Sequence, residues 1–206
     1  MCFAVKEEAR AFQKVVGKRL NPKVMLVGMG KRNAERAIRA ALAKERPEVV
    51  LTCGFAGGLK PGLAMGTVVF AAGPETGLEP ALLAAGAKPA RFHCADRVAA
   101  TAEQKRALWE VTGADAVEME SEVICAVCRE QSIPCATVRV ILDTAYEDLP
   151  LDFSRLMTAD EKMSYGKLAL ALAKSPGKVG ALLRLQKATQ AAAGKLAEVL
   201  RRITAA

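Results

Sequence analysis

Short apolar runs alternate along the chain with segments whose apolar residues recur at helical spacing. The apolar runs predict strands at residues 2–5, 24–28, 49–53, 66–71, 116–118 and 135–141. The periodic segments predict helices at residues 7–20, 33–46, 101–112, 121–131, 161–174 and 179–203. Because strands and helices alternate in this order, we expect a three-layer α/β/α fold around a mixed, mainly parallel central sheet.

The chain contains no sign of a domain boundary. Its 206 residues suit a single hydrophobic core, and 51% hydrophobic against 25% charged residues is a balance typical of a globular domain. Residues 73–92, with three Gly and three Pro, predict a loop with a short helix and not a linker. We therefore expect one domain over residues 1–206, in which residues 154–206 form a C-terminal helical extension.

The net charge of +8 is concentrated at the C-terminal end. Residues 151–206 hold 10 Lys and Arg against 4 Asp and Glu, whereas residues 1–150 are nearly balanced at 20 against 18. Such basic helices are usually solvated faces, and no aromatic interleaving or Gly-rich basic loop points to nucleic acid. A weak peripheral contact with an anionic membrane surface stays open for these helices.

The cysteines and the apolar runs indicate a cytoplasmic protein. No apolar run approaches the roughly 18–20 residues needed to span a bilayer, and the N-terminus lacks the pattern of a secretory signal. The six cysteines stand mostly inside apolar runs, which predicts reduced, buried thiols. Cys125 and Cys128 form a Cys-x-x-Cys pair, but no second pair or His follows at zinc spacing, so we expect no metal site.

Three predicted strands end in segments suited to ligand binding: Gly28-Met-Gly30, Gly54-Phe-Ala-Gly-Gly58 and Asp143. Ligands of parallel sheets bind beyond the carboxyl ends of the strands, and glycines offer bare N–H donors there. Each segment alone is more typical of a tight turn than of a ligand site. A dinucleotide-dependent oxidoreductase is excluded, because Asn33 replaces the third glycine of the fingerprint and the second strand ends in Thr52-Cys53 without the expected acid.

Together with Val117-Glu-Met-Glu-Ser121, these segments resemble the purine nucleoside phosphorylase and methylthioadenosine/S-adenosylhomocysteine nucleosidase superfamily. The likeness covers roughly residues 3–155. It rests on Ala4-Val-Lys-Glu-Glu8, Gly28-Met-Gly30, Cys53-Gly-Phe-Ala-Gly-Gly58 with Met65-Gly-Thr-Val-Val, Ala116-Val-Glu-Met-Glu120 and Val138-Arg-Val-Ile-Leu-Asp143, in that order. The resemblance implies cleavage of the bond between a purine and its sugar, no cofactor, and a homodimer.

That reaction needs an acid for the departing base and a polar group for the sugar hydroxyls. The resemblance implies that Asp143 meets the purine N7, that Glu120 holds the ribose hydroxyls with Met119 packed on the sugar, and that Glu8 activates water. Further substrate contacts implied by the resemblance are Glu118, Ala56, Gly57, Gly30 and Val98. From the residues alone, Glu8 also fits a helix N-terminal acid and Asp143 a turn residue.

The attacking group is either water or phosphate. Hexameric purine phosphorylases carry an Arg near the position of Glu8, and a carboxylate there repels phosphate, so Glu8 favours hydrolysis. Lys31 and Arg32, which follow Gly30 at a predicted helix start, form a plausible anion site and keep phosphate open. Both also fit the solvated start of a helix.

The chain departs from the family pattern at several points. The first strand is short, Val98 replaces the aromatic residue that stacks on the base, and Leu142 replaces a small polar residue before Asp143. These departures support an alternative, a non-catalytic nucleoside-binding protein that keeps the fold. The basic tail looks like the hopanoid-associated phosphorylase branch, whose implied substrate is an adenosyl group attached to a lipid.

Overall fold

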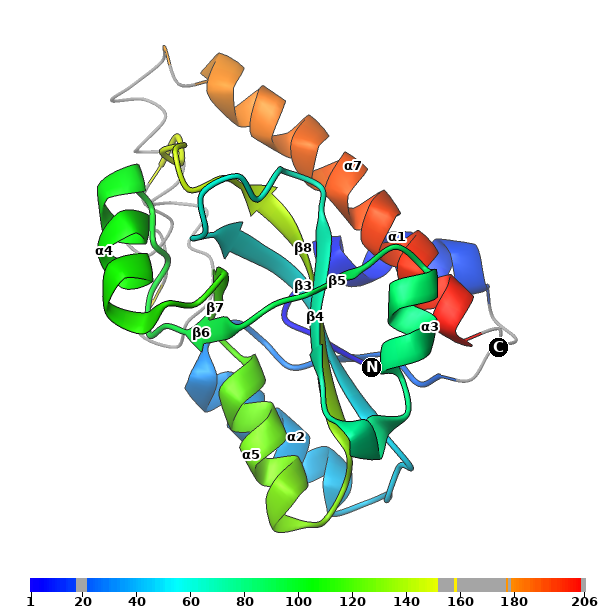
Figure 1. Ribbon diagram of the computed structural model, residues 1–206. Coiled ribbons are helices and arrows are strands. Elements are labelled where there is room, and N and C mark those ends of the chain that lie inside the picture. The colour runs from blue at the N-terminus through cyan, green and yellow to red at the C-terminus, as the bar shows by residue number, and fades with distance from the viewer. Residues whose placement is uncertain (18–21, 152–157, 159–176, 178, 205–206) are drawn as a thin grey trace.

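The computed structural model describes residues 1–17, 22–151, 158, 177 and 179–204, and all structural statements concern these residues (Figure 1). The helices are α1 (Lys6–Val16), α2 (Lys31–Leu42), the 3-10 helix η1 (Pro74–Thr76), α3 (Glu79–Ala84), α4 (Ala102–Thr112), α5 (Ser121–Glu130) and α7 (Val179–Thr204). The strands are β1 (Cys2–Phe3), β2 (Met25–Leu26), β3 (Val50–Gly58), β4 (Val68–Ala72), β5 (Lys88–Pro89), β6 (Phe92–Cys94), β7 (Ala116–Glu118) and β8 (Cys135–Asp143).

One mixed sheet contains these strands. Its main path runs β2-β1-β3-β8-β4-β5, while β7 pairs with the far end of β3 and β6 pairs with β7. The pairs β1–β2, β1–β3, β3–β8, β4–β5 and β6–β7 are parallel, and only β3–β7 and β4–β8 are antiparallel among the described strands. The expected mixed, mainly parallel sheet is confirmed.

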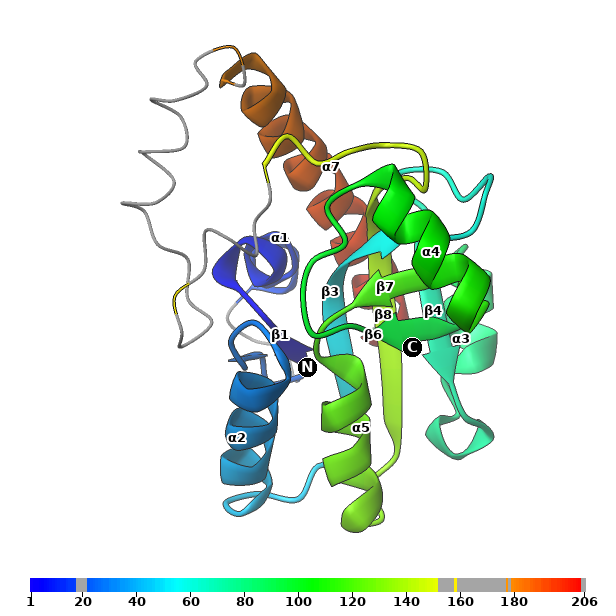
Figure 2. The same ribbon diagram turned by 90° about the vertical axis from the view of Figure 1, so that its left-hand side faces the viewer.

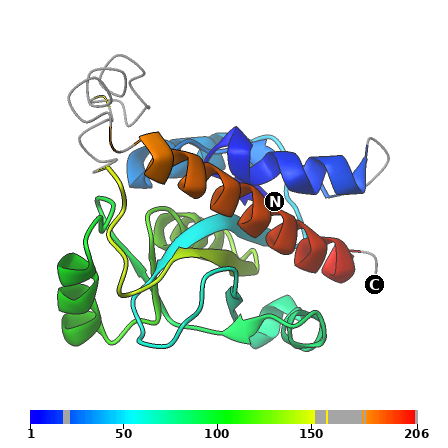
Figure 3. The ribbon, with the colours of Figure 1, turned by 90° about the horizontal axis from the view of Figure 1, so that it is seen from above.

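Helices cover both faces of the sheet, as the views of Figures 1 and 3 show. On one face, α1 and α7 pack together over β3 and β8, around Phe3, Phe12, Val138 and Leu196. On the other face, α2 and α5 pack together around Ile38 and other apolar residues; the rest of this cluster includes Cys2, Val27, Ala34, Val50, Ile124 and Val127. The expected three layers are confirmed.

Most predicted helices are present with adjusted ends. Helix α4 matches its prediction, because the Thr101 hydroxyl accepts a hydrogen bond from Gln104 N and Gly113 ends the helix in a left-handed conformation. Helix α1 is shorter than predicted, since Gly17 follows its last turn. Residues 73–92 contain the expected short helix, α3, and also the short strand β5. The predicted helix at 161–174 lies outside the described residues.

The prediction that the third strand ends at Gly54 is wrong. Strand β3 continues to Gly58, because parallel β8 and antiparallel β7 both offer pairing partners to its last residues. Ala56 and Gly57, which we expected in a loop, are therefore part of the sheet. Their backbone groups are largely committed to pairing with β7 and β8.

Helix α7 is part of the main hydrophobic core. Helix α7 buries Leu196, Leu200 and several small residues in the same core as Phe3 and Val138. Together with α1 it forms the helical layer on one face of the sheet, as Figure 2 also shows (α7 in orange and red). No helix among the described residues is long and apolar enough to cross a membrane.

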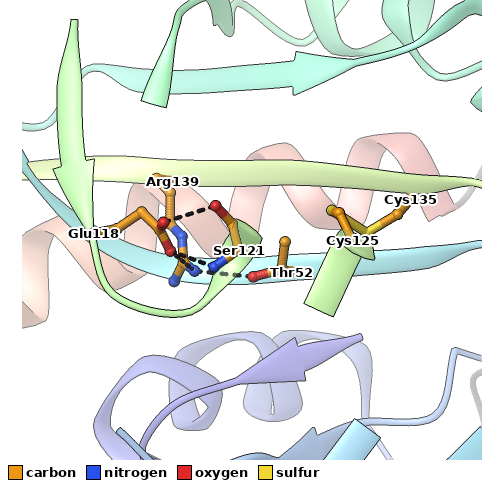
Figure 4. The surroundings of a disulfide bond; sticks show 6 residues. All are labelled: Thr52, Glu118, Ser121, Cys125, Cys135 and Arg139. Carbon is orange, nitrogen blue, oxygen red and sulfur yellow. Dashed lines mark hydrogen bonds and ion pairs between the residues drawn. A yellow bond between two sulfur atoms is a disulfide. The ribbon is translucent and has the colours of Figure 1, made fainter. Parts of the chain in front are cut away.

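The prediction of six reduced thiols is also wrong. Cys125, in α5, and Cys135, the first residue of β8, form a disulfide with a Cα–Cα distance of 5.4 Å (Figure 4). The short turn between α5 and β8 returns the chain beside the helix, which brings the two residues together. The other cysteines, Cys2, Cys53, Cys94 and Cys128, are buried free thiols.

Candidate active site

The predicted acids gather at one edge of the sheet, from the parallel strands β1 and β8 and from β7, which runs antiparallel to β3. Glu8 follows β1 in the first turn of α1, Glu118 is the last residue of β7, and Glu120 comes just before α5. Asp143 is the last residue of β8. All four carboxylates are buried, with exposed fractions between 5% and 9%. Ionisable groups are seldom buried without partners, so each one must be matched within the protein.

Arg139, in the middle of β8, is the centre of this arrangement. Its side chain is 1% exposed, and its Nη2 donates to Glu118 Oε2 at 2.6 Å and to Thr52 Oγ1 at 2.9 Å (Figure 4). Glu120 Oε2 lies 3.6 Å from the same nitrogen. Burial opposes the charge of Arg139, but Glu118, Glu120 and Glu8 together raise its pKa. We call Arg139, Glu8, Glu118 and Glu120 the Arg139 cluster.

Within this cluster, Glu118 is fully used by the protein itself. Its Oε2 accepts hydrogen bonds from the backbone N–H groups of Glu120 and Ser121, and its Oε1 accepts one from the Ser121 hydroxyl at 2.7 Å. Burial raises the pKa of Glu118, but Arg139 and these hydrogen bonds outweigh it and keep the pKa below its ordinary value. Glu118 thus fixes the first turn of α5, and with it the backbone that carries Glu120.

Glu120 faces the start of α2. Its Oε1 accepts a hydrogen bond of 2.8 Å from the backbone N–H of Gly30, the residue before that helix. Burial raises the pKa of Glu120 to about 7; Arg139 opposes this rise, while Glu118 and Glu8 add to it. Glu120 therefore changes its charge near neutral pH, which is a property suited to a functional carboxylate.

Glu8 links α1 to β3. Its Oε2 accepts hydrogen bonds from the N–H groups of Ala4 and Val5, and its Oε1 accepts one from Phe55 at 2.8 Å. Glu8 therefore acts as a helix N-terminal acid, which was the alternative role expected from the sequence. Its contact with β3 also holds its carboxylate within the Arg139 cluster. Burial raises its pKa, against the opposing effects of Arg139 and the three N–H donors.

Gly54 is the reason that Glu8 and Arg139 can approach β3 so closely. A Cβ atom at this position would overlap both the Glu8 carboxylate and the Arg139 guanidinium. The residue pairs with Arg139 across the β3–β8 ladder. The glycine that we expected to shape a ligand loop instead makes space for the two charged side chains.

Asp143 is directed by a β-bulge. In the β3–β8 ladder Ala56 pairs with Ile141, but Gly57 pairs with Asp143, so Leu142 is an extra residue. Leu142 packs against the core shared with α1 and α7. Asp143 lies against Gly57, where a Cβ would come within 3.4 Å of Asp143 Oδ2. Burial raises the pKa of Asp143, and the nearby Lys105 opposes this rise.

The other predicted site residues differ in their partners and exposure. Lys31 forms an ion pair of 2.8 Å with Asp96 and lies 3.9 Å from Glu122, so two carboxylates compensate its charge. Arg32 is exposed, and Met119 and Val98 are half-buried, Val98 in the loop that also carries Asp96. No group of described His, Cys, Asp and Glu side chains is arranged to hold a metal ion.

A separate groove of about 600 Å³ lies between α7 and the start of β4. None of the four buried carboxylates lines this groove. Its charged lining residues are Lys88, Lys195, Glu198 and Arg202. The groove has no buried ionisable group, so we assign the candidate chemistry to the Arg139 cluster and Asp143.

A family model described as "Phosphorylase superfamily" matches residues 5–82 and 81–174, which is most of the chain and includes Glu8, Glu118, Glu120 and Asp143. The chain belongs to the phosphorylase superfamily. The resemblance inferred from the order of the sequence segments is thereby confirmed.

Solved structures of other proteins support the fold of this superfamily member. A methylthioadenosine/S-adenosylhomocysteine nucleosidase from Helicobacter pylori matches with a TM-score of 0.70 and 17% identity, over 98% of this chain and 95% of that one. The corresponding nucleosidase from Campylobacter jejuni matches with a TM-score of 0.70 and 16% identity, over 98% of this chain and 96% of that one. Futalosine hydrolase from H. pylori matches with a TM-score of 0.66 and 16% identity, over 97% of this chain and 95% of that one. These matches include the C-terminal region, which agrees with α7 as part of the fold.

Sequence reasoning missed Arg139 and Lys105 as members of the site. Arg139 gave a signal, because an arginine inside an apolar central strand must have buried partners. Lys105 gave almost none, since it stands in a helix rich in charged residues. Only its position three residues before Leu108, on the same helical side, hinted that it faces inward.

Proposed function

We propose that this protein cleaves the N-glycosidic bond of a purine nucleoside or adenosyl conjugate and releases the free base, by hydrolysis. The observation that carries this proposal is the set of buried carboxylates Glu8, Glu120 and Asp143 at the carboxyl ends of the strands of a phosphorylase-superfamily sheet. Bond cleavage leaves positive charge on the sugar and negative charge on the base, and these acids can serve both sides of the bond.

Each carboxylate has a role suited to its surroundings. Asp143, whose pKa is raised by burial, donates a proton to the departing base. Glu120, with one oxygen on Gly30 N and the other near Arg139, accepts hydrogen bonds from the sugar hydroxyls. Glu8 takes the proton from the attacking water. Met119 and Val98 contact the sugar and the base, while Ala56 and Gly57, at the end of β3, lie beside the base.

Charge around the site favours water over phosphate as the attacking group. The Arg139 cluster holds three carboxylates and one guanidinium, so it repels an anion. Lys31, the residue best placed to bind phosphate at the start of α2, is already paired with Asp96. The nucleosidases and futalosine hydrolase among the similar structures also bear names that imply hydrolysis. Homodimer formation and weak membrane contact through the basic C-terminal helices stay predictions.

The direct test is base release by the purified protein. We expect free purine from adenosine, methylthioadenosine, S-adenosylhomocysteine or inosine, measured by chromatography, at the same rate with and without phosphate. If base release required phosphate, the reaction would be phosphorolysis, and Lys31 and Arg32 would be candidate phosphate-binding residues. Binding of adenosine without release from any substrate would favour the non-catalytic alternative. The Asp143→Asn variant, purified identically, controls for contaminating nucleosidases.

Glu120 predicts an acid limb in the pH profile. Its ionised form accepts hydrogen bonds from two hydroxyls, and protonation removes this capacity as pH falls through about 7. We therefore expect kcat/KM to decrease by about tenfold per pH unit below pH 7, because this ratio reports groups of the free enzyme. In Glu120→Gln the value should be low at all pH values and lack this limb. If the decrease of kcat/KM below pH 7 persisted in Glu120→Gln, it would arise from the titration of another group.

A further inference from the structure

Lys105 is a lysine buried completely beneath the candidate acid. Its side chain is 0% exposed, although helix α4 offers solvent on its other sides. Its Nζ forms an ion pair with Asp143 Oδ2. An ammonium group is costly to bury unless all of its charge and all of its donors are matched, so this position needs an explanation.

All three donors of the ammonium group have acceptors. Besides Asp143, Lys105 Nζ donates to the backbone carbonyl of Thr144 at 2.8 Å and to that of Glu147 at 2.6 Å. The turn between these carbonyls is closed by the Glu147 carboxylate, which accepts hydrogen bonds from the N–H and the hydroxyl of Thr144. One amine thus holds the end of β8, the acid on it and the turn that follows.

The contact with Lys105 also decides which oxygen of Asp143 can meet a ligand. Oδ2 is buried and has no hydrogen-bond partner among the described residues besides its ion pair with Lys105. Any contact of this carboxyl with a ligand is therefore made by Oδ1. The small polar residue that commonly precedes the acid in this superfamily is Leu142 here, and Leu142 packs into the core. A partner from α4 therefore orients Asp143 in its place.

We propose that Lys105 is a positioning residue for Asp143: it fixes Oδ2 and stabilises the carboxylate that remains when Oδ1 has given its proton to the departing base. The inference rests on the proposed function. In the step, the Oδ1–H bond breaks, the proton forms a bond to a base nitrogen, and the electron pair stays on Asp143. Lys105 keeps its own proton throughout and provides the counter-charge in a buried site, where such a charge is most effective.

The charged groups that face Asp143 are Lys105 from α4 and Glu147 from the following turn. Lys105 favours the ionised form of Asp143, and Glu147 disfavours it. Removal of Lys105 therefore raises the pKa of Asp143, and this change can be measured in the free protein, without any substrate.

The test is a double-substitution cycle. We expect Lys105→Met to decrease kcat for base release by on the order of tenfold or more with KM changed less than about twofold, because the effect arises during proton transfer. In an Asp143→Asn background the same substitution should change kcat by less than about twofold, since Lys105 acts only through Asp143. The control is Arg106→Met, which removes the neighbouring exposed charge from α4 and should leave kcat unchanged.

A second measurement is independent of turnover. In a titration of the Asp143 carboxyl carbon by NMR, we expect a higher midpoint in Lys105→Met than in wild type and in Arg106→Met. Lys105→Gln, which removes the charge but keeps hydrogen-bond donors, replaces Lys105→Met if that variant does not fold. Equal losses of kcat in both backgrounds, or an unchanged midpoint, would overturn the proposal. Absence of base release by the wild type contradicts the proposed function alone, because the titration still tests the contact.

Discussion

Asp143→Asn is expected to decrease kcat for base release by about 10²–10⁴-fold, which is the usual contribution of a general acid. Asparagine has the same shape and keeps an oxygen for Lys105, but it has no acidic proton to give to the base. KM should change little, because binding of the sugar relies on other residues. Single-turnover measurements of free base at neutral pH are the appropriate assay, since they separate the chemical step from product release.

Asp115→Asn is a matched control for this variant. Asp115 Oδ2 accepts a hydrogen bond from Arg91 N at 2.8 Å, which an amide oxygen can also accept, and the residue is not part of the Arg139 cluster. We expect wild-type kcat from this control. If Asp143→Asn retained activity within tenfold of wild type while folded, Asp143 would not be the acid, and the departing base would need another proton donor.

Arg139→Met is expected to lower the free energy of unfolding by about 3–5 kcal/mol, which is the usual cost of breaking a buried ion pair from one side. Methionine fills much of the volume, but it leaves Glu118 buried without its counter-ion. Urea unfolding at pH 7.5, followed by circular dichroism, measures the difference. Arg36→Met removes an exposed arginine from α2 and should change the free energy of unfolding by less than about 0.5 kcal/mol.

The loss of stability in Arg139→Met should depend on pH in a defined direction. In wild type the pKa of Glu118 is below its ordinary value, so ionised Glu118 stabilises the fold above that ordinary value, and this contribution disappears as pH falls through the folded pKa. The variant lacks this contribution. Its deficit against wild type should therefore be larger at pH 7.5 than at pH 4. A deficit that is small, or that grows on acidification, would contradict a stabilising role for Arg139.

The architecture was predictable because it follows from local patterns. Apolar runs of strand length and helical periodicity indicated the three layers, and helix α4 matched its prediction closely because Thr101 and Gly113 are recognisable capping residues at its two ends. The gathering of Glu8 and Asp143 was predictable as well, because β1 and β8 both run parallel to β3 and their carboxyl ends lie at one edge of the sheet. Glu120 joins them from β7, which runs antiparallel to β3.

What could not be predicted depends on contacts between distant segments. The continuation of β3 from Gly54 to Gly58 requires pairing with β8 and with β7, and both of these strands follow it by more than fifty residues. The disulfide of Cys125 requires the return of the chain to Cys135. The partners of Asp143 depend on a bulge at Leu142 and on an inward-facing lysine of α4, and neither has a local pattern that distinguishes it from a regular strand or a solvated helix.

The bulge at Leu142 has a consequence for how this protein can change in evolution. Arg139 and Asp143 stand on one strand, and the extra residue between them sets which side of the sheet Asp143 meets. An amino-acid replacement at position 142 alters packing only, whereas deletion of one residue between 139 and 143 reverses the direction of the acid. Insertions and deletions should thus be tolerated in the surface loops of related genes but be rare in this short stretch of β8.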